Sequence, residues 1–168
     1  MKTCTFTGHR PNKLPWLYNE EDRECLKFKQ VLAQEILATI EDGYDYFICG
    51  GAQGMDTWSA ELVLYLRDSF KHIKLEIAVP CQGQESLWPR KTQERYYSIL
   101  KEADKVTMCS TEHYRPQLMF LRDMYMVNKA EKLIALYEGS SGGTAHTIGL
   151  ASKKGLHIIK FNSMGLKH

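Results

Sequence analysis

The order of hydrophobic and polar positions along the chain predicts strands that alternate with helices. A short run of β-branched, aromatic and aliphatic residues that stops at glycine, proline or a polar turn is typical of a strand. The first such run stops at Gly8 and the third at Pro80. Six runs of this kind occur, at residues 3–7, 45–49, 73–79, 105–109, 132–137 and 157–161.

The longer segments between these runs carry apolar residues near helical spacing. In the first segment they are Phe28, Val31, Leu32, Ile36 and Ile40. Gly43 follows that segment as a helix stop signal. Five helices are expected in total, at residues 20–40, 57–67, 90–103, 116–130 and 144–154.

Strands that alternate with helices of ten or more residues predict βαβ units and a parallel sheet. Right-handed crossovers then place helices on both faces of the sheet. We therefore expect an α/β fold: a Rossmann-like, doubly wound, mostly parallel sheet of about six strands, formed as a single domain by residues 1–168. In such a sheet all strands end at the same edge, where ligands bind near the reversal of strand order.

Composition narrows the class of protein. The chain has 168 residues, of which 43% are hydrophobic and 25% charged, so it is neither disordered nor fibrous. No apolar run is long enough for a membrane-spanning helix, and the N-terminus lacks the layout of a signal peptide. The five cysteines are scattered without CxxC spacing, which favours reduced thiols in a cytoplasmic protein.

The charge balance argues against two kinds of partner. Lys and Arg number 22 and Asp and Glu 20, which leaves a net charge of +2. So small an excess favours neither nucleic acid nor a membrane surface as a partner. The six histidines lack HxH or HExxH spacing, so no metal site is expected.

Three glycine-rich loops follow predicted strands and carry the candidate chemistry. They contribute Gly8, His9 and Arg10, then Gly50, Gly51, Gly54 and Asp56, and finally Ser141, Gly142, Gly143 and Thr144. Glycine lets backbone amides approach a ligand closely, and the second and third loops run into helix N-termini, which favour anions. These loops predict a phosphate-bearing ligand at one edge of the sheet. Neither GxGxxG nor GxxxxGK[ST] is present, which disfavours NAD dehydrogenases and P-loop enzymes.

Most of these side chains have a structural interpretation beside the functional one. Asp56 and Thr144 either cap their helices or touch ligand, as a ribose or base acceptor and a phosphate contact respectively. Arg10 is either a solvated surface residue or a charged fork on phosphate. His9 is more typical of a structural histidine than of a catalytic one.

Four further residues lie outside the glycine-rich loops. Trp88 either closes the domain as a hydrophobic clasp or stacks on a nucleobase, and Glu85 either meets a ribose hydroxyl or faces water. Arg122 lies on the wet face of its helix, or pairs with phosphate or with a carboxylate such as Asp123 of a partner chain. Glu138 is the best-placed general acid or base, although a bond to a ribose hydroxyl or to loop amides is favoured.

The helix at residues 116–130 is rich in apolar residues around most of its circumference. Its cluster of Met119, Met124, Tyr125 and Met126 is most simply core. Part of the cluster alternatively forms the surface of a homodimer.

The loops GHRP at residues 8–11, GGAQGMD at 50–56 and GSSGGT at 139–144 resemble the YpsA-type branch of the SLOG superfamily. That superfamily also contains the LOG phosphoribohydrolases and the DNA-processing protein DprA. The resemblance covers nearly the whole chain and includes the following features: residues 80–88, Ala103, Asp104, Tyr114, Arg122 and Asn128. It implies a Rossmann-like fold that binds an ADP-ribose- or NAD-related ligand.

The resemblance leaves three functions to compare. The first is binding or sensing of a small nucleotide-derived ligand, and the second is hydrolysis of an N-glycosidic bond in a nucleotide. LOG enzymes carry a PGGxGTxxE loop, and here Thr147 stands in place of its glutamate, which argues against the second. The third is a DprA-like module for single-stranded DNA, which the near-neutral charge disfavours.

Overall fold

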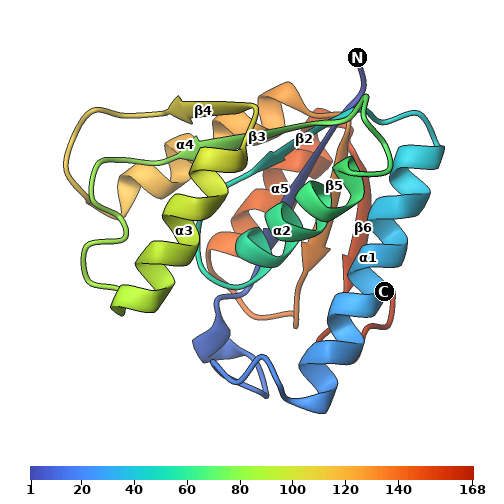
Figure 1. The fold of residues 1–168 in the computed structure, drawn as a ribbon, viewed down its shortest axis with the longest axis horizontal. Coiled ribbons are helices and arrows are strands. Elements are labelled where there is room, and N and C mark those ends of the chain that lie inside the picture. The colour runs from blue at the N-terminus through green and yellow to red at the C-terminus, as the bar shows by residue number, and fades with distance from the viewer.

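The computed structural model describes residues 1–168 and shows a six-stranded sheet with helices on both faces (Figure 1). Every pair of neighbouring strands is parallel, and the spatial order is β4-β3-β2-β1-β5-β6. The strands are β1 (Thr3–Gly8), β2 (Tyr46–Cys49), β3 (Lys74–Val79), β4 (Lys105–Met108), β5 (Lys132–Leu136) and β6 (His157–Phe161). The predicted doubly wound α/β fold is confirmed.

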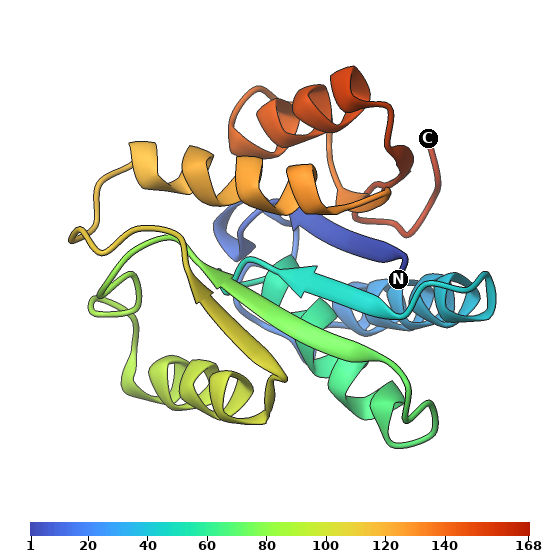
Figure 2. The same ribbon diagram turned by 90° about the horizontal axis from the view of Figure 1, so that it is seen from above.

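The helices are divided between the two faces of the sheet, as Figure 2 shows. Three of them cover one face: α1 (Arg23–Glu41), α2 (Met55–Arg67) and α3 (Arg90–Glu102). The other face carries α4 (Gln117–Lys129) and α5 (Gly143–Lys154). A short 3₁₀ helix, η1 (Pro11–Lys13), follows β1 and is not expected from the sequence.

The start of α1 differs from the prediction. The helix begins at Arg23 rather than at residue 20, because the Asp22 carboxylate accepts a hydrogen bond from the Glu24 amide at 2.8 Å and caps the first turn. Glu20 and the residues before it form turns that lead from η1 into the helix.

The strand order reverses beside β1, and this reversal positions the candidate site. Strands β2, β3 and β4 extend from one side of β1, whereas β5 and β6 extend from the other. Gly8 at the end of β1 pairs with Leu136 at the end of β5. The chains leaving these two strands diverge onto opposite faces, which opens a crevice at the carboxyl edge of the sheet.

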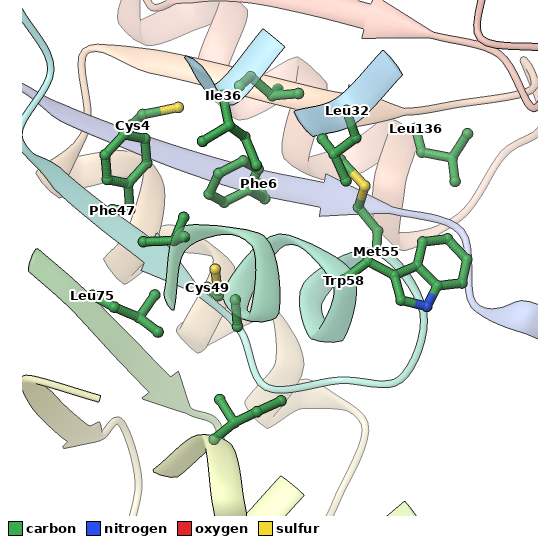
Figure 3. Close-up of a cluster of buried hydrophobic side chains, with 14 of the residues drawn as sticks. Cys4, Phe6, Leu32, Ile36, Phe47, Cys49, Met55, Trp58, Leu75 and Leu136 are labelled. Carbon is green, nitrogen blue, oxygen red and sulfur yellow. The ribbon is translucent and has the colours of Figure 1, made fainter. Parts of the chain in front are cut away.

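The main core lies between the sheet and helices α1 and α2 (Figure 3). Phe6 and Phe47 from neighbouring strands stack with their ring centroids 6.3 Å apart. Trp58 on α2 packs edge-on against Phe28 of α1, with centroids 6.1 Å apart. Full burial of each such side chain contributes roughly 1.5–3 kcal/mol, so this layer supplies much of the framework that holds the edge loops.

Helix α4 buries one face and exposes another. Met126 and Val127 are buried against the sheet, whereas Phe120, Leu121 and Met124 are each more than two-fifths exposed. Tyr125 and Met119 are intermediate, so only part of the predicted cluster is core. Self-association through the exposed stripe stays a prediction. None of the helices combines the length and apolar character that a membrane crossing requires.

Candidate functional site

The three loops meet at a pocket of about 220 Å³ beside the reversal of strand order. We call this cavity the switch-point pocket. Its walls come from β1, η1, the start of α2, α4 and the start of α5. Seven of the residues selected from the sequence line it: Gly8, His9, Arg10, Asp56, Arg122, Gly143 and Thr144.

The N-terminus of α5 forms one wall of the pocket. Its N-cap is Gly142, whose φ of 135° suits glycine, and no side chain caps the helix. The amides of Gly143, Thr144 and Ala145 have no acceptor within the chain, since His146 makes the first helical bond, to Gly142. The interpretation of Thr144 as a cap is wrong, because this buried residue lies inside the first turn and lines the pocket.

Two basic side chains line the pocket, and one of them stands beside these free amides. Arg10 and Lys13 both line the pocket, and both are exposed. The Lys13 ammonium lies 3.4 Å from the position that a Cβ on Gly142 would occupy, which places its charge at the helix N-cap. Amides, helix dipole and ammonium together create a positive end of the pocket.

Arg122 also lines the pocket and is only 6% exposed. Its Nε donates to the Asp123 carboxylate at 2.7 Å, its Nη1 donates to the Gly50 carbonyl oxygen, and Nη1 lies 4.0 Å from Asp56 Oδ2. Burial opposes its charge, but the two carboxylates prevail and raise the pKa of Arg122. The placement of Arg122 on a wet helix face is therefore wrong: it is buried because carboxylates of its own chain compensate it.

Asp56 is buried in the first turn of α2 and accepts a hydrogen bond from the Ala52 amide at 3.2 Å. The N-cap of α2 is Gly54, so the interpretation of Asp56 as the cap is wrong. Burial raises the pKa of the Asp56 carboxyl, and Arg122 partly offsets this. Asp56 and Asp123 both line the pocket and present acceptor oxygens to it.

His9 ties the loop after β1 to the loop after β5. Its Nε2 accepts a hydrogen bond from the Glu138 amide at 3.0 Å, which requires an unprotonated nitrogen. Burial, with help from the Lys13 charge, lowers the pKa of His9. The Glu138 carboxylate turns away to accept from the Ser163 amide at 2.7 Å and does not line the pocket.

The second glycine loop supports the pocket instead of lining it. Gly50 is covered by Arg122, a Cβ on Gly51 would meet the Tyr96 ring at 3.2 Å, and one on Gly54 would meet Pro11 at 3.0 Å. Only Ala52 and Asp56 of that segment line the cavity. Ser141 and Gly142 are exposed beside the cavity without forming its wall.

A second cavity, of about 230 Å³, adjoins the first and is lined by Trp88. We call it the aromatic pocket. It shares Arg10 and Met119 with the switch-point pocket. Trp88 is partly buried and packs edge-on against Tyr96, with centroids 5.4 Å apart. Glu85 does not line it, and its carboxylate accepts from the Tyr97 hydroxyl at 3.3 Å.

Comparison with known proteins identifies the family. The profile of the YpsA family, described as the YspA SLOG family, matches residues 4–157. The chain belongs to the YpsA SLOG family. Among curated relatives of this YpsA SLOG protein, a UPF0398 protein of Halalkalibacterium halodurans is 32% identical over 156 residues, covering 92% of this chain and 82% of the relative. A UPF0398 protein of Bacillus thuringiensis is 30% identical over 165 residues, covering 97% and 89%.

Two solved structures share the fold of this YpsA SLOG chain. DNA processing protein A from Helicobacter pylori aligns with a TM-score of 0.64 at 13% identity, over 95% of this chain and 65% of that one. DNA processing protein A from Streptococcus pneumoniae aligns with a TM-score of 0.63 at 12% identity, over 95% and 50%. The chain therefore spans only part of either protein.

Several residues of the YpsA SLOG pocket are not evident from the sequence. Lys13 and Asn12 lie in the unexpected η1, directly after the GHRP loop, and that proximity is the only signal for them. The sequence suggests Asp123 only as a partner in another chain, and Met119 as core or as part of a dimer surface. No three His, Cys, Asp or Glu side chains converge in a way that could hold a metal ion.

Proposed function

We propose that this chain binds a phosphate-bearing, nucleotide-derived ligand in the switch-point pocket. The observation that carries the proposal is the uncapped N-terminus of α5, whose first amides lack acceptors and have the Lys13 ammonium beside them. A phosphate group would accept from these amides and pair with Lys13 and Arg10.

The acidic residues of the pocket suit a sugar. Asp56 and Asp123 offer carboxylate oxygens that would accept hydrogen bonds from ribose hydroxyls, and Arg122 holds both carboxylates in place. This polarity, positive at α5 and acidic at α2, supports an ADP-ribose- or NAD-related ligand. We infer a binding or sensing role for residues 1–168 acting as one domain. All five cysteines are free thiols, which suits a cytoplasmic setting.

Calorimetric titration with ADP-ribose and AMP tests the proposal. We expect saturable binding, and at a ligand concentration one hundred times Kd the folded state gains about 2.7 kcal/mol, seen as a raised Tm. Lys13→Ala should weaken binding about tenfold, since it removes the charge beside the phosphate. Lys27→Ala, an exposed lysine on α1, is the matched control. Absence of binding and of a Tm shift at millimolar ligand would overturn the proposal.

Single-stranded DNA is the second candidate ligand. DNA processing protein A from Helicobacter pylori, which shares this fold, binds single-stranded DNA. In this chain the exposed Tyr114 ring lines the aromatic pocket at the same edge, where a base could stack. Titration of an oligonucleotide at two salt concentrations separates the candidates. DNA binding predicts a steep loss of affinity with salt, whereas a mononucleotide site shows a shallow one.

Hydrolysis of an N-glycosidic bond has weaker support from the geometry. The Glu138 carboxylate is engaged with Ser163, and the Thr147 hydroxyl, at the position of the LOG glutamate, donates to the Gly143 carbonyl oxygen at 3.0 Å. Release of free base from AMP by the unaltered chain, together with loss of that activity in Glu138→Gln, would support hydrolysis.

A further inference from the structure

The aromatic pocket is built from two segments that lie far apart in sequence. Beyond the ends of β3 and β4, Gln82 forms an isolated parallel bridge with His113, and its amide donates to the Glu112 carbonyl oxygen at 3.1 Å. This bridge carries Tyr114 alongside the segment 83–88. Trp88 and Tyr114 therefore line one cavity, although neither belongs to a strand or helix.

The segment that carries Trp88 is fastened at several points. The Gln93 side-chain amide donates to the carbonyl oxygens of Ser86 at 3.3 Å and Trp88 at 3.1 Å. The Gln84 amide donates to the Gly51 carbonyl oxygen at 3.4 Å and to the Tyr96 hydroxyl at 3.3 Å. A loop held in this way keeps the indole in position before a ligand arrives, which lowers the entropic cost of binding.

The aromatic pocket continues from the switch-point pocket. Arg10 and Met119 line both cavities, and Arg10 Nη2 lies 3.9 Å from Met119 Sδ, so this pair of side chains marks the boundary between the two. The second cavity offers aromatic and aliphatic surface from Trp88, Tyr114 and Leu87, and its one charged lining residue is Arg10. Such a surface recognises the face of a flat ring instead of a charged group.

The geometry points to the aromatic pocket as a nucleobase subsite. On the proposed function, the ligands are nucleoside phosphates. Their base stacks on Trp88 while their phosphate lies at the N-terminus of α5. Arg10, exposed at the junction, would contact the phosphate and the sugar-base portion together. Aromatic side chains stack on all the nucleobases, so the subsite requires a base but discriminates little between one base and another.

The experiment compares AMP with ribose 5-phosphate, which differs from AMP by the missing base. Titrations use the full chain, its Trp88→Ala, Trp88→Phe and Tyr114→Ala variants, and Tyr65→Ala as a control for an exposed tyrosine on α2. We expect Trp88→Ala to weaken AMP binding about tenfold, to leave ribose 5-phosphate within twofold, and Trp88→Phe to restore most of the loss. Tyr114→Ala should weaken AMP alone, and Tyr65→Ala should change neither.

The outcomes separate this inference from the proposed function. If both ligands bind equally well to the unaltered chain, or if Trp88→Ala weakens both equally, the base subsite is overturned while phosphate binding stands. If neither ligand binds, the proposed function and the subsite both fail for nucleoside monophosphates. A loss confined to AMP, together with quenching of tryptophan fluorescence by AMP that disappears in Trp88→Phe, supports the subsite.

Discussion

Arg122 on α4 donates a hydrogen bond to the carbonyl oxygen of Gly50, which lies 72 residues earlier in the chain, directly after β2. The same guanidinium holds the carboxylates of Asp56 and Asp123. One buried cation therefore connects the second glycine loop, α2 and α4, and fixes the two carboxylates that line the switch-point pocket.

Replacement of Arg122 by Ala should destabilise the protein by about 3–5 kcal/mol. The substitution leaves two buried carboxylates without their cation. Removal of one partner from a buried ion pair is strongly destabilising because the remaining charge is uncompensated. Denaturant unfolding monitored by circular dichroism measures the change. Arg115→Ala removes a surface pair with Glu112 and should cost at most about 1 kcal/mol. Equal effects of the two substitutions would contradict the structural role of Arg122.

Gly50→Ala should be destabilising because the Arg122 side chain occupies the space that a methyl group needs. A Cβ on Gly50 would lie 2.5 Å from Arg122 Nη1 and 2.8 Å from Asp56 Oδ2, so the buried cluster must shift, at a cost of about 1–3 kcal/mol. Gly149→Ala in α5 is the matched control, since nothing lies within 4 Å of its Cβ position. Alanine is the better helix former, and this control should gain up to about 1 kcal/mol in thermal unfolding.

The hydrogen bond from the Glu138 amide makes folding sensitive to protonation of His9. Burial and the Lys13 charge lower the pKa of His9 from its ordinary value of 6.5. Because the unfolded chain then binds the proton more readily, the His9 contribution is present above about pH 6.5 and is lost as pH falls toward the folded-state pKa.

Titration of the His9 ring by NMR measures this pKa directly. His9→Gln removes the titrating group. As pH falls from about 7 to about 5, the unaltered chain should therefore lose more stability than this variant does. A difference independent of pH would contradict the account.

Glu20 should stabilise the protein in a pH-dependent way through its contacts with α1 and α3. Burial opposes its charge, but hydrogen bonds from Arg95 at 2.7 Å and Lys29 at 2.6 Å lower the pKa of Glu20 from 4.5 to about 2. The stabilisation is therefore complete above about pH 4.5 and lost as pH falls toward 2.

Glu20→Gln provides the measurement for that linkage. The unaltered chain should be more stable than the variant at neutral pH, and the two should converge as pH is lowered toward 2. Glu24→Gln, at an exposed position in the first turn of α1, is the matched control. A constant gap between the Glu20 variant and the unaltered chain down to pH 2 would show that its charge contributes nothing.

Local patterns along the chain are enough to predict the fold class and the edge of the sheet where the loops lie. Strand runs and helical spacing are local properties, since side chains alternate along strands and recur every three to four residues in helices. The parallel sheet follows from their alternation, and the position of Gly8, Gly50 and Gly142 after strands follows with it. Helix ends were less accurate: Asp22 rather than residue 20 marks the start of α1, because its cap depends on a single side-chain bond.

Which loop residues line the cavity and which support it depends on long-range packing. Sequence spacing does not show that Arg122 meets carboxylates from two helices, so its burial depends on partners up to 72 residues away. The same holds for Lys13, which reaches the start of α5 from a 3₁₀ turn, and for Glu138, whose carboxylate is drawn to Ser163. Charged side chains take their environment from long-range contacts, because burial is tolerated only where distant parts of the chain supply the opposite charge.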